Sequence, residues 1–186
     1  NFNNNKKYKY MKSPYQRTIV FDTETGGLKS SFNSLTELAF VAIDMDTLEE
    51  IDEMEVMILP YLDLSTIEED DLKEAKALDI ELFKSLYLND GDIIDYPKLV
   101  EIEETDLRDL ALLFFDKCYN PGAFEATGIN RQLLLDEGID KGLAYKKIEA
   151  FLLKHTLGNS KPILSGHNIR KFDNPFMEKF FSLHNK

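Results

Sequence analysis

The stretch of sequence that decides the fold is "IVFDTETGG", residues 19–27. It opens with a run of β-branched and aromatic residues, which is typical of a strand buried in a sheet. Asp22 and Glu24 follow one residue apart, and a pair of glycines closes the stretch. Side chains at positions i and i+2 of a strand point to the same face. We therefore expect the two carboxylates to project together if the strand continues through Thr23.

Two neighbouring carboxylates at the end of a core strand have two interpretations. Ionised carboxylates that lie close together repel each other, and a shared proton or a divalent cation relieves that repulsion. The backbone N–H groups at Gly26 and Gly27 are open to a bulky or anionic group that approaches closely. The other interpretation is a strand end that becomes solvated at a turn. The Asp-x-Glu pattern by itself leaves both interpretations open.

Length and composition indicate the general class of protein. The chain has 186 residues, enough for one domain with a substantial core, and 43% of its residues are apolar. No stretch is long and apolar enough to span a bilayer, and the first residues lack the apolar segment of a secretory signal. The single cysteine, Cys118, excludes an intrachain disulfide and suits a reducing compartment. We therefore expect an intracellular (cytoplasmic) protein with no membrane partner.

The charge is distributed unevenly along the chain. The formal net charge is −12, but residues 44–109 hold 23 of the 34 acidic residues and only 5 of the 22 basic ones. This segment therefore carries a net charge of −18, and the remainder of the chain carries +6. Because acidity belongs to one segment, the net charge does not exclude a nucleic-acid partner.

The hydrophobic pattern predicts an α/β protein. Three strands are predicted first, and a short connection between the second and third indicates an antiparallel meander. Helical periodicity then dominates, with one further short strand before a last helix, which suggests a mixed sheet flanked by helices. The polar first residues, 1–16, are predicted to be a disordered tail. The predicted strands are 17–22, 36–44, 53–59 and 162–166, and the predicted helices are 71–88, 105–119, 130–137, 142–156 and one from about 174.

A second group of polar residues lies in "SGHNIRKFDNPFM", residues 165–177. Phe172 and Phe176 are expected to be buried and to hold Asp173 at the start of the last helix. An aspartate in this position is also a common N-cap, and a helix N-terminus tolerates negative charge. A cap and a metal ligand are therefore both compatible with Asp173.

Four segments together resemble the DEDD superfamily of 3′→5′ exonucleases. They are "IVFDTETGGL", "TELAFVAID", "ATGINRQLL" and "GHNIRKFDNPFM", in the family's order, and the resemblance covers about residues 17–59 and 123–184. The family's first motif is Asp-x-Glu, matched by Asp22 and Glu24, and Asp173 matches the acid of the second motif. The spacing from Asn168 to Asp173 is similar to that of exonuclease I and of polymerase exonuclease domains. The "ATGIN" segment is similar to the exonuclease I and DnaQ-like branch.

The resemblance implies a ribonuclease-H-like fold, with a three-stranded antiparallel meander, parallel strands and flanking helices. It also implies two Mg²⁺ or Mn²⁺ ions, about 4 Å apart, that hydrolyse the phosphodiester bond at the 3′ end of single-stranded DNA or RNA. By the same resemblance, Asp22, Glu24 and Asp173 would be the catalytic metal ligands. Glu37 is equally compatible with a place behind them and with a solvent-facing position at the edge of the site. The residues implied to contact the substrate are Thr25, Gly26, Leu28, Ile129 and Asn168; Ile129 is equally compatible with a place in the core.

The sequence departs from the family in two places. The family's fourth acid and general base lie on a late helix, as H-x-x-x-x-D or Y-x-x-x-D, and His184 is followed by only two residues. We therefore expect an N-terminal portion of a longer protein, with little or no activity by itself. The second departure is an acidic, helical insertion at about 60–120. We expect its 60–118 segment to face away from the cleft, to bind a protein partner, or to act as a solubilising surface.

Two functional hypotheses follow. The first is a metal-dependent 3′→5′ exonuclease in DNA replication or repair, either free-standing or attached to a polymerase. The second is a catalytically inactive exonuclease-fold module that serves as a protein- or nucleic-acid-binding scaffold. The absent last motif favours the scaffold, and the retained acids Asp22, Glu24 and Asp173 favour the enzyme.

Overall fold

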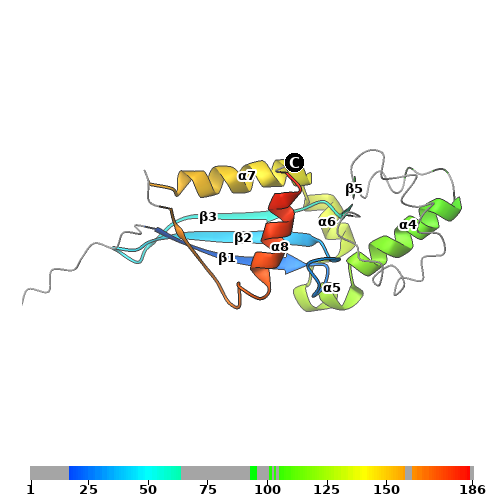
Figure 1. The fold of residues 1–186 in the computed structure, drawn as a ribbon, viewed down its shortest axis with the longest axis horizontal. Helices are drawn as coiled ribbons and strands as arrows, with labels where there is room; N and C mark the ends of the chain where they lie inside the picture. Colours follow the sequence, from blue (N-terminus) through cyan, green and yellow to red (C-terminus); the bar gives the residue numbers. More distant parts are fainter. Residues whose placement is uncertain are drawn as a thin grey trace, which may run out of the picture.

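The computed structural model describes residues 17–63, 93–95, 101, 103, 105–157 and 161–184. Strands and helices follow one another as a mixed α/β chain (Figure 1). The strands are β1 (Arg17–Thr25), β2 (Leu35–Asp44), β3 (Glu50–Met57), β4 (Tyr61–Asp63), β5 (Ile93–Asp95) and β6 (Ile163–Ser165). The helices are α4 (Thr105–Cys118), α5 (Pro121–Thr127), α6 (Arg131–Glu137), α7 (Lys141–Lys154) and α8 (Asp173–Ser182).

The main sheet has the strand order β3-β2-β1-β6. Strands β1, β2 and β3 form an antiparallel meander, and β6 pairs with β1 in parallel. The meander, the mixed sheet and the flanking helices confirm the predicted fold class, a ribonuclease-H-like α/β arrangement. Strand β1 lies inside the sheet, so its side chains have neighbours on both sides.

Strand β1 separates an apolar face of the sheet from a polar one. Ile19, Phe21 and Thr23 are buried, whereas Asp22 between them is exposed. The register places Phe21 opposite Phe40 of β2, and their rings stack with centroids 5.8 Å apart. A shift of one residue would reverse the two faces, so the burial of these side chains fixes the register.

Helices α7 and α8 cover the apolar face. Figure 1 shows α8 crossing the strands, with α7 running beside β3. Both helices contribute side chains to one core cluster with the sheet: Ala144, Ile148 and Phe151 from α7, and Phe176, Met177 and Phe180 from α8. Full burial of a large apolar side chain stabilises a fold by about 1.5–3 kcal/mol, so this layer is a main source of stability.

A buried histidine fastens the end of α7 to the sheet. The Nδ1 atom of His155 lies 3.0 Å from a guanidinium nitrogen of Arg17, and its Nε2 atom lies 2.8 Å from Asp52 Oδ2. Because a guanidinium only donates, Nδ1 must accept and Nε2 carries the proton that is donated to Asp52. Lys154 also donates to Asp52, and these hydrogen bonds lower the pKa of the Asp52 carboxyl. The cluster joins β1, β3 and α7 at the end of the sheet where β1 begins.

The predicted insertion is described only in part. Strands β4 and β5 form a separate two-stranded antiparallel sheet, and α4 matches the helix predicted at 105–119. The Tyr119 hydroxyl accepts a hydrogen bond from the backbone N–H of Tyr61 and donates one to its carbonyl, both at 2.9 Å. This bond ties the end of α4 to β4. The helix predicted at 71–88 lies outside the described residues, and the tail and domain boundaries stay predictions.

Helix α5 is absent from the sequence-based prediction, in which "NPG" ended the preceding helix. The side chain of Asn120 instead caps α5 and accepts a hydrogen bond from the Gly122 N–H at 2.8 Å, and Pro121 is the first helical residue. Proline suits this position because its missing N–H would be unpaired there in any case. The remaining predicted elements correspond to α6, α7, β6 and α8 within a few residues. None of the helices described here is long and apolar enough to cross a membrane.

The core can be tested at Phe40, which is 1% exposed and lies between Phe21 and Phe151. We expect Phe40→Ala to lower the free energy of unfolding by about 3–5 kcal/mol, because it leaves a cavity that neighbouring side chains fill only in part. Urea unfolding followed by circular dichroism measures the change. Leu153→Ala is the control, since this side chain is 65% exposed and its loss should change stability by less than about 0.5 kcal/mol. Equal losses in the two variants would contradict the assignment of Phe40 to the core.

Candidate active site

Strand β1 continues through Thr25 and places Asp22 and Glu24 on its polar face. Glu24 lies opposite Glu37 of β2 in the register. Burial raises the pKa of the Glu24 carboxyl, and the negative charges of Asp22 and Asp173 raise it further. The three acids of the two predicted motifs therefore lie close enough to influence one another electrostatically.

Glu37 extends this acidic surface across the sheet. Burial raises the pKa of the Glu37 carboxyl most, followed by the charges of Glu55, Glu24 and Asp22. These four carboxylates come from three adjacent strands at the end of the sheet where β1 finishes. Like charges in such an arrangement are relieved by proton uptake or by a cation.

Asp173 approaches β1 from the start of α8, on the side of the strand where Thr23 is buried. The side chain is 2% exposed, and its Oδ1 atom accepts hydrogen bonds from the Thr23 hydroxyl at 2.7 Å and the Thr23 N–H at 3.2 Å. Helix α8 begins at Asp173 itself, and its N-cap, Phe172, makes no side-chain capping bond. Asp173 therefore does not act as the N-cap that the sequence allowed. Its carboxylate instead joins the start of α8 to β1.

The acids suit a hard divalent cation chemically, because all of their donor atoms are oxygens. Among the residues that the structure describes, no three His, Cys, Asp or Glu side chains gather closely enough to hold a metal ion. One oxygen of Asp173 is already occupied by Thr23. Asp22 and Glu24 therefore present the more accessible oxygens, and the metal roles of all three acids stay predictions.

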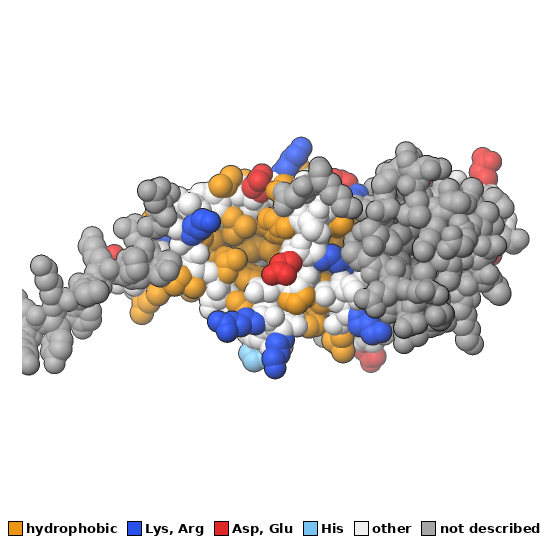
Figure 2. Space-filling view, viewed as in Figure 1, with side chains coloured by type: hydrophobic (Ala, Val, Ile, Leu, Met, Phe, Trp, Pro, Cys, Tyr) orange, Lys and Arg blue, Asp and Glu red, His pale blue; other side chains and the backbone are white. Residues whose placement is uncertain are grey.

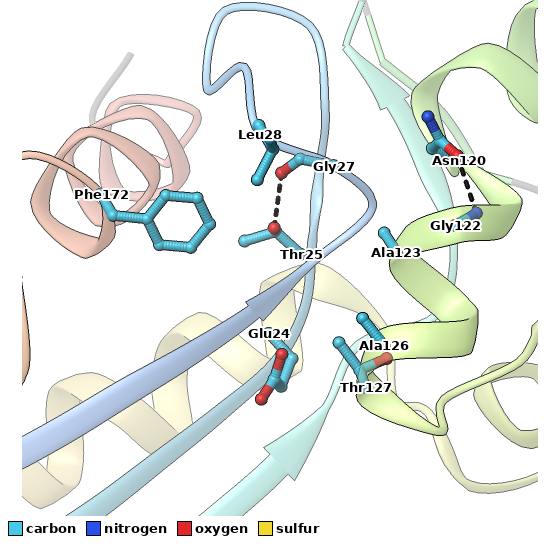
Figure 3. Close-up of a pocket in the computed structure, with 10 residues that line it drawn as sticks. All are labelled: Glu24, Thr25, Gly27, Leu28, Asn120, Gly122, Ala123, Ala126, Thr127 and Phe172. Carbon is cyan, nitrogen blue, oxygen red and sulfur yellow. Dashed lines mark hydrogen bonds between the residues drawn. The ribbon is translucent and has the colours of Figure 1, made fainter.

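A pocket of about 370 Å³ opens beside Glu24. Figure 3 shows α5 on one side of the end of β1 and Phe172 on the other. The lining is mainly apolar, and Glu24 provides its carboxylate. The residues that line the pocket are Glu24, Thr25, Gly27, Leu28, Asn120, Gly122, Ala123, Ala126, Thr127 and Phe172. An apolar cleft with one well-placed acid suits a flat organic group that carries a polar or charged substituent.

Leu28 and Phe172 give the pocket its apolar surfaces. Leu28 is 85% exposed, so its side chain is accessible to a molecule in the pocket. Thr25 lines the pocket as well, but its hydroxyl donates to the Gly27 carbonyl at 2.6 Å (Figure 3). Thr25 therefore fixes the shape of the loop that carries Leu28.

Backbone contacts hold the two walls of the pocket together. The Gly26 carbonyl accepts a hydrogen bond from the N–H of Asn120 at 2.7 Å, and the Asn33 side chain donates to the Cys118 carbonyl at 2.9 Å. A Cβ atom on Gly26 would lie 2.3 Å from that carbonyl oxygen, so only glycine allows this approach. Gly26 thus supports the pocket without lining it. Asn33 is a supporting residue that sequence analysis missed, because its partner lies 85 positions away.

The structure does not place every predicted substrate residue at this pocket. Ile129 is 5% exposed and packs in the interior, which agrees with its alternative role in the core. Asn168 is exposed and lines a different cavity, together with Gly166, Ile169, Arg170 and Lys171. The structure therefore brings Glu24, Thr25 and Leu28 together with Phe172, and the substrate contacts of Ile129 and Asn168 stay predictions.

Comparisons with known proteins bear on the fold. Neither a family model nor a curated protein matches the sequence. Among solved structures, E. coli exonuclease I bound to a dA16 oligonucleotide is 15% identical with a TM-score of 0.51, over 90% of this chain and 24% of that chain. The dT13 complex of the same enzyme gives a TM-score of 0.52 at the same identity and coverage. Exonuclease I from Methylocaldum szegediense is 14% identical with a TM-score of 0.47, over 86% and 22% of the two chains.

The likeness to the two E. coli structures shows that the chain has an exonuclease I-like fold. The chain spans about a quarter of the length of the solved structures that it matches. The motifs in β1 and at the start of α8 predict this fold from the sequence.

The bond between Thr23 and Asp173 can be tested by isosteric substitution. We expect Thr23→Val to lower the free energy of unfolding by about 1.5–3 kcal/mol, because a buried carboxylate loses a charge-assisted hydrogen bond. Thr18→Val is the matched control on the same strand, since the Thr18 hydroxyl makes an exposed contact of 3.4 Å with the Ile163 carbonyl. Thermal and urea unfolding measure both variants. A Thr23→Val variant as stable as the control would show that the bond contributes little.

The raised pKa of Glu24 predicts a pH-dependent stability. Because the folded state binds this proton more tightly than the unfolded state, stability falls as pH rises from the ordinary value of 4.5 through the raised one. Glu24→Gln removes the loss of stability that occurs when the Glu24 carboxyl ionises in the folded protein. We expect the stability of this variant relative to the unsubstituted protein to increase between about pH 4 and pH 7, in urea unfolding with EDTA present. Glu137→Gln, at an exposed position on α6, should show no such trend; a flat profile for Glu24→Gln would contradict the coupling.

Proposed function

We propose that this chain carries the catalytic core of a metal-dependent 3′→5′ exonuclease that acts on single-stranded nucleic acid. The observation that supports it most is that Glu24, which shares the polar face of β1 with Asp22, lines an apolar pocket at the end of the strand. Removal of a terminal nucleotide requires carboxylates for cations and a surface for the base, and both are present here. The exonuclease I-like fold is consistent with this assignment.

Residues around the pocket then have distinct roles. Asp22 and Glu24 would hold the cations, and the free oxygen of Asp173 would add a ligand. Bound divalent ions supply an activated water and neutralise the leaving oxygen. Leu28 and Phe172 would contact the terminal base, because aromatic and apolar surfaces bind bases without sequence preference. The Gly26–Gly27 backbone packs against Cys118 and Asn33 and so fixes the end of β1 beside the pocket.

The solved relatives suggest the class of substrate. E. coli exonuclease I has been solved with dA16 and dT13 oligonucleotides, and its complex with single-stranded DNA has been solved in metal-free and zinc-bound forms. Single-stranded DNA is therefore the substrate that we propose for this chain, with RNA ends as the second choice. Protein binding through the acidic 60–118 segment stays a separate proposal.

The second candidate function is an inactive exonuclease-fold module that binds nucleic acid or protein. Two observations favour it: the described residues do not gather a metal-holding set of three, and Thr23 occupies one oxygen of Asp173. In this case the pocket and the acidic surface would bind a ligand without cleaving it.

Digestion of a labelled oligonucleotide distinguishes the two functions. The full natural protein that contains this chain is incubated with Mg²⁺ or Mn²⁺ and a 5′-labelled single-stranded DNA, and the products are resolved by length. We expect a ladder that shortens from the 3′ end. Loss of groups that only orient metal ligands typically costs about 10–100-fold, so Asp22→Asn and Glu24→Gln should each reduce the rate by at least about 100-fold.

Glu137→Gln provides the control for this experiment and should leave the rate unchanged. Parallel reactions with RNA of the same sequence compare the two substrates. If the protein binds the oligonucleotide but leaves it intact with either metal, the module without catalysis becomes the better account.

A further inference from the structure

The loop 166–172, between β6 and α8, carries basic side chains that the proposed chemistry does not use. His167, Arg170 and Lys171 are all exposed. Their side chains have no hydrogen-bond or ion-pair partner within the portion of the chain that the structure describes. In a chain with a net charge of −12, the charged side chains of Arg170 and Lys171 are available for a negatively charged ligand.

The backbone of this loop is held in a defined turn. Asn168 has a φ of 53°, in the left-handed region that non-glycine residues seldom adopt, and its carbonyl accepts hydrogen bonds from the N–H groups of Lys171 and Phe172. A Cβ atom on Gly166 would lie 2.4 Å from the Phe21 carbonyl oxygen, so the loop starts pressed against β1. Phe21 immediately precedes Asp22, and the loop therefore begins beside the acidic pair.

The turn surrounds a hollow of its own. A second cavity of about 370 Å³ is lined by Gly166, Asn168, Ile169, Arg170 and Lys171. The loop then continues directly into Phe172, which lines the pocket beside Glu24. In Figure 1 the loop forms the lower edge of the molecule beneath α8, and Figure 2 shows basic side chains and a histidine at that edge.

These positions complement the charge distribution of a nucleic-acid strand. The terminal nucleotide at the pocket lies next to carboxylates, which repel its phosphates in the absence of cations. A strand that leaves the pocket past Phe172 meets Arg170 and Lys171 within two residues along the chain. Contacts between Lys or Arg and phosphate supply most of the affinity of proteins for single strands.

We propose that loop 166–172 is a phosphate-binding track for the single strand whose 3′ end occupies the pocket. Arg170 and Lys171 each contact a backbone phosphate, and His167 offers a further hydrogen-bond donor. The track rests on the proposed function, because it takes the pocket to hold the strand end. It extends that function by assigning the residues that bind the strand beyond the terminal nucleotide, independently of base sequence.

Salt-dependent binding tests the track without catalysis. Fluorescence anisotropy measures the affinity of the protein for a 5′-labelled oligothymidylate in EDTA over a fourfold range of salt. Each phosphate contact on a single strand contributes about 0.7 to the slope of log affinity against log salt. We expect the double variant Arg170→Ala/Lys171→Ala to reduce the slope by about 1.4. Over the fourfold range of salt, the variant should therefore lose about sevenfold less affinity than the unsubstituted protein. The charge-preserving variant Arg170→Lys/Lys171→Arg should keep the slope.

Lys146→Ala/Lys147→Ala is the matched control, since these two exposed lysines are also adjacent in the chain but lie on α7. Circular dichroism verifies that each variant is folded. If the loop variant and the control reduce the slope equally, or if the loop variant leaves it unchanged, the track is wrong and the proposed function stands. If the unsubstituted protein does not bind the oligonucleotide at all, both proposals fail.

Discussion

The hydrogen bonds from Thr23 to the buried carboxylate of Asp173 hold strand β1 and the start of helix α8 in position. A carboxylate that is removed from water requires such donors, because an unpaired buried charge costs several kcal/mol. The bonds fix the first residue of α8 against the strand that carries Asp22 and Glu24. Everything attached to that point is fixed with it: Phe172 at the pocket, the loop that precedes it, and the α8 side chains that fill the core.

Strand β1 serves both the core and the site, because its side chains alternate between the two faces of the sheet. Its buried side chains satisfy the core, and the side chains between them collect negative charge at one end of the sheet. Burial of the Glu24 and Glu37 carboxyls, together with the negative charges of neighbouring acids, opposes folding, as the raised pKa values of both groups indicate. Such a penalty is common where side chains are arranged for chemistry, and the aromatic and aliphatic layer beneath α7 and α8 offsets it.

The sequence predicted those parts of the fold and site that depend on local patterns. The short connection between β2 and β3 predicted the meander, and the two-residue spacing of Asp22 and Glu24 placed both on one face. Helix α5 was missed because the Asn120–Pro121 pair has two meanings: it ends one helix, and it also caps the next. The bond from Thr23 to Asp173 spans 150 positions, and no periodicity signals it. The pocket itself is built from three separate segments, so only the folded chain brings Leu28, α5 and Phe172 together.

The close contact between the pocket loop and the end of α4 also provides a natural chemical reporter. Cys118 is the single cysteine of the chain, and it is 1% exposed at the last residue of α4. Because the thiol is buried, a reagent reaches it only when the structure around this helix end opens. The labelling rate of the native protein thus reports local opening next to the site. A molecule that bridges the Leu28 loop and α5 would slow that labelling, without any engineered probe.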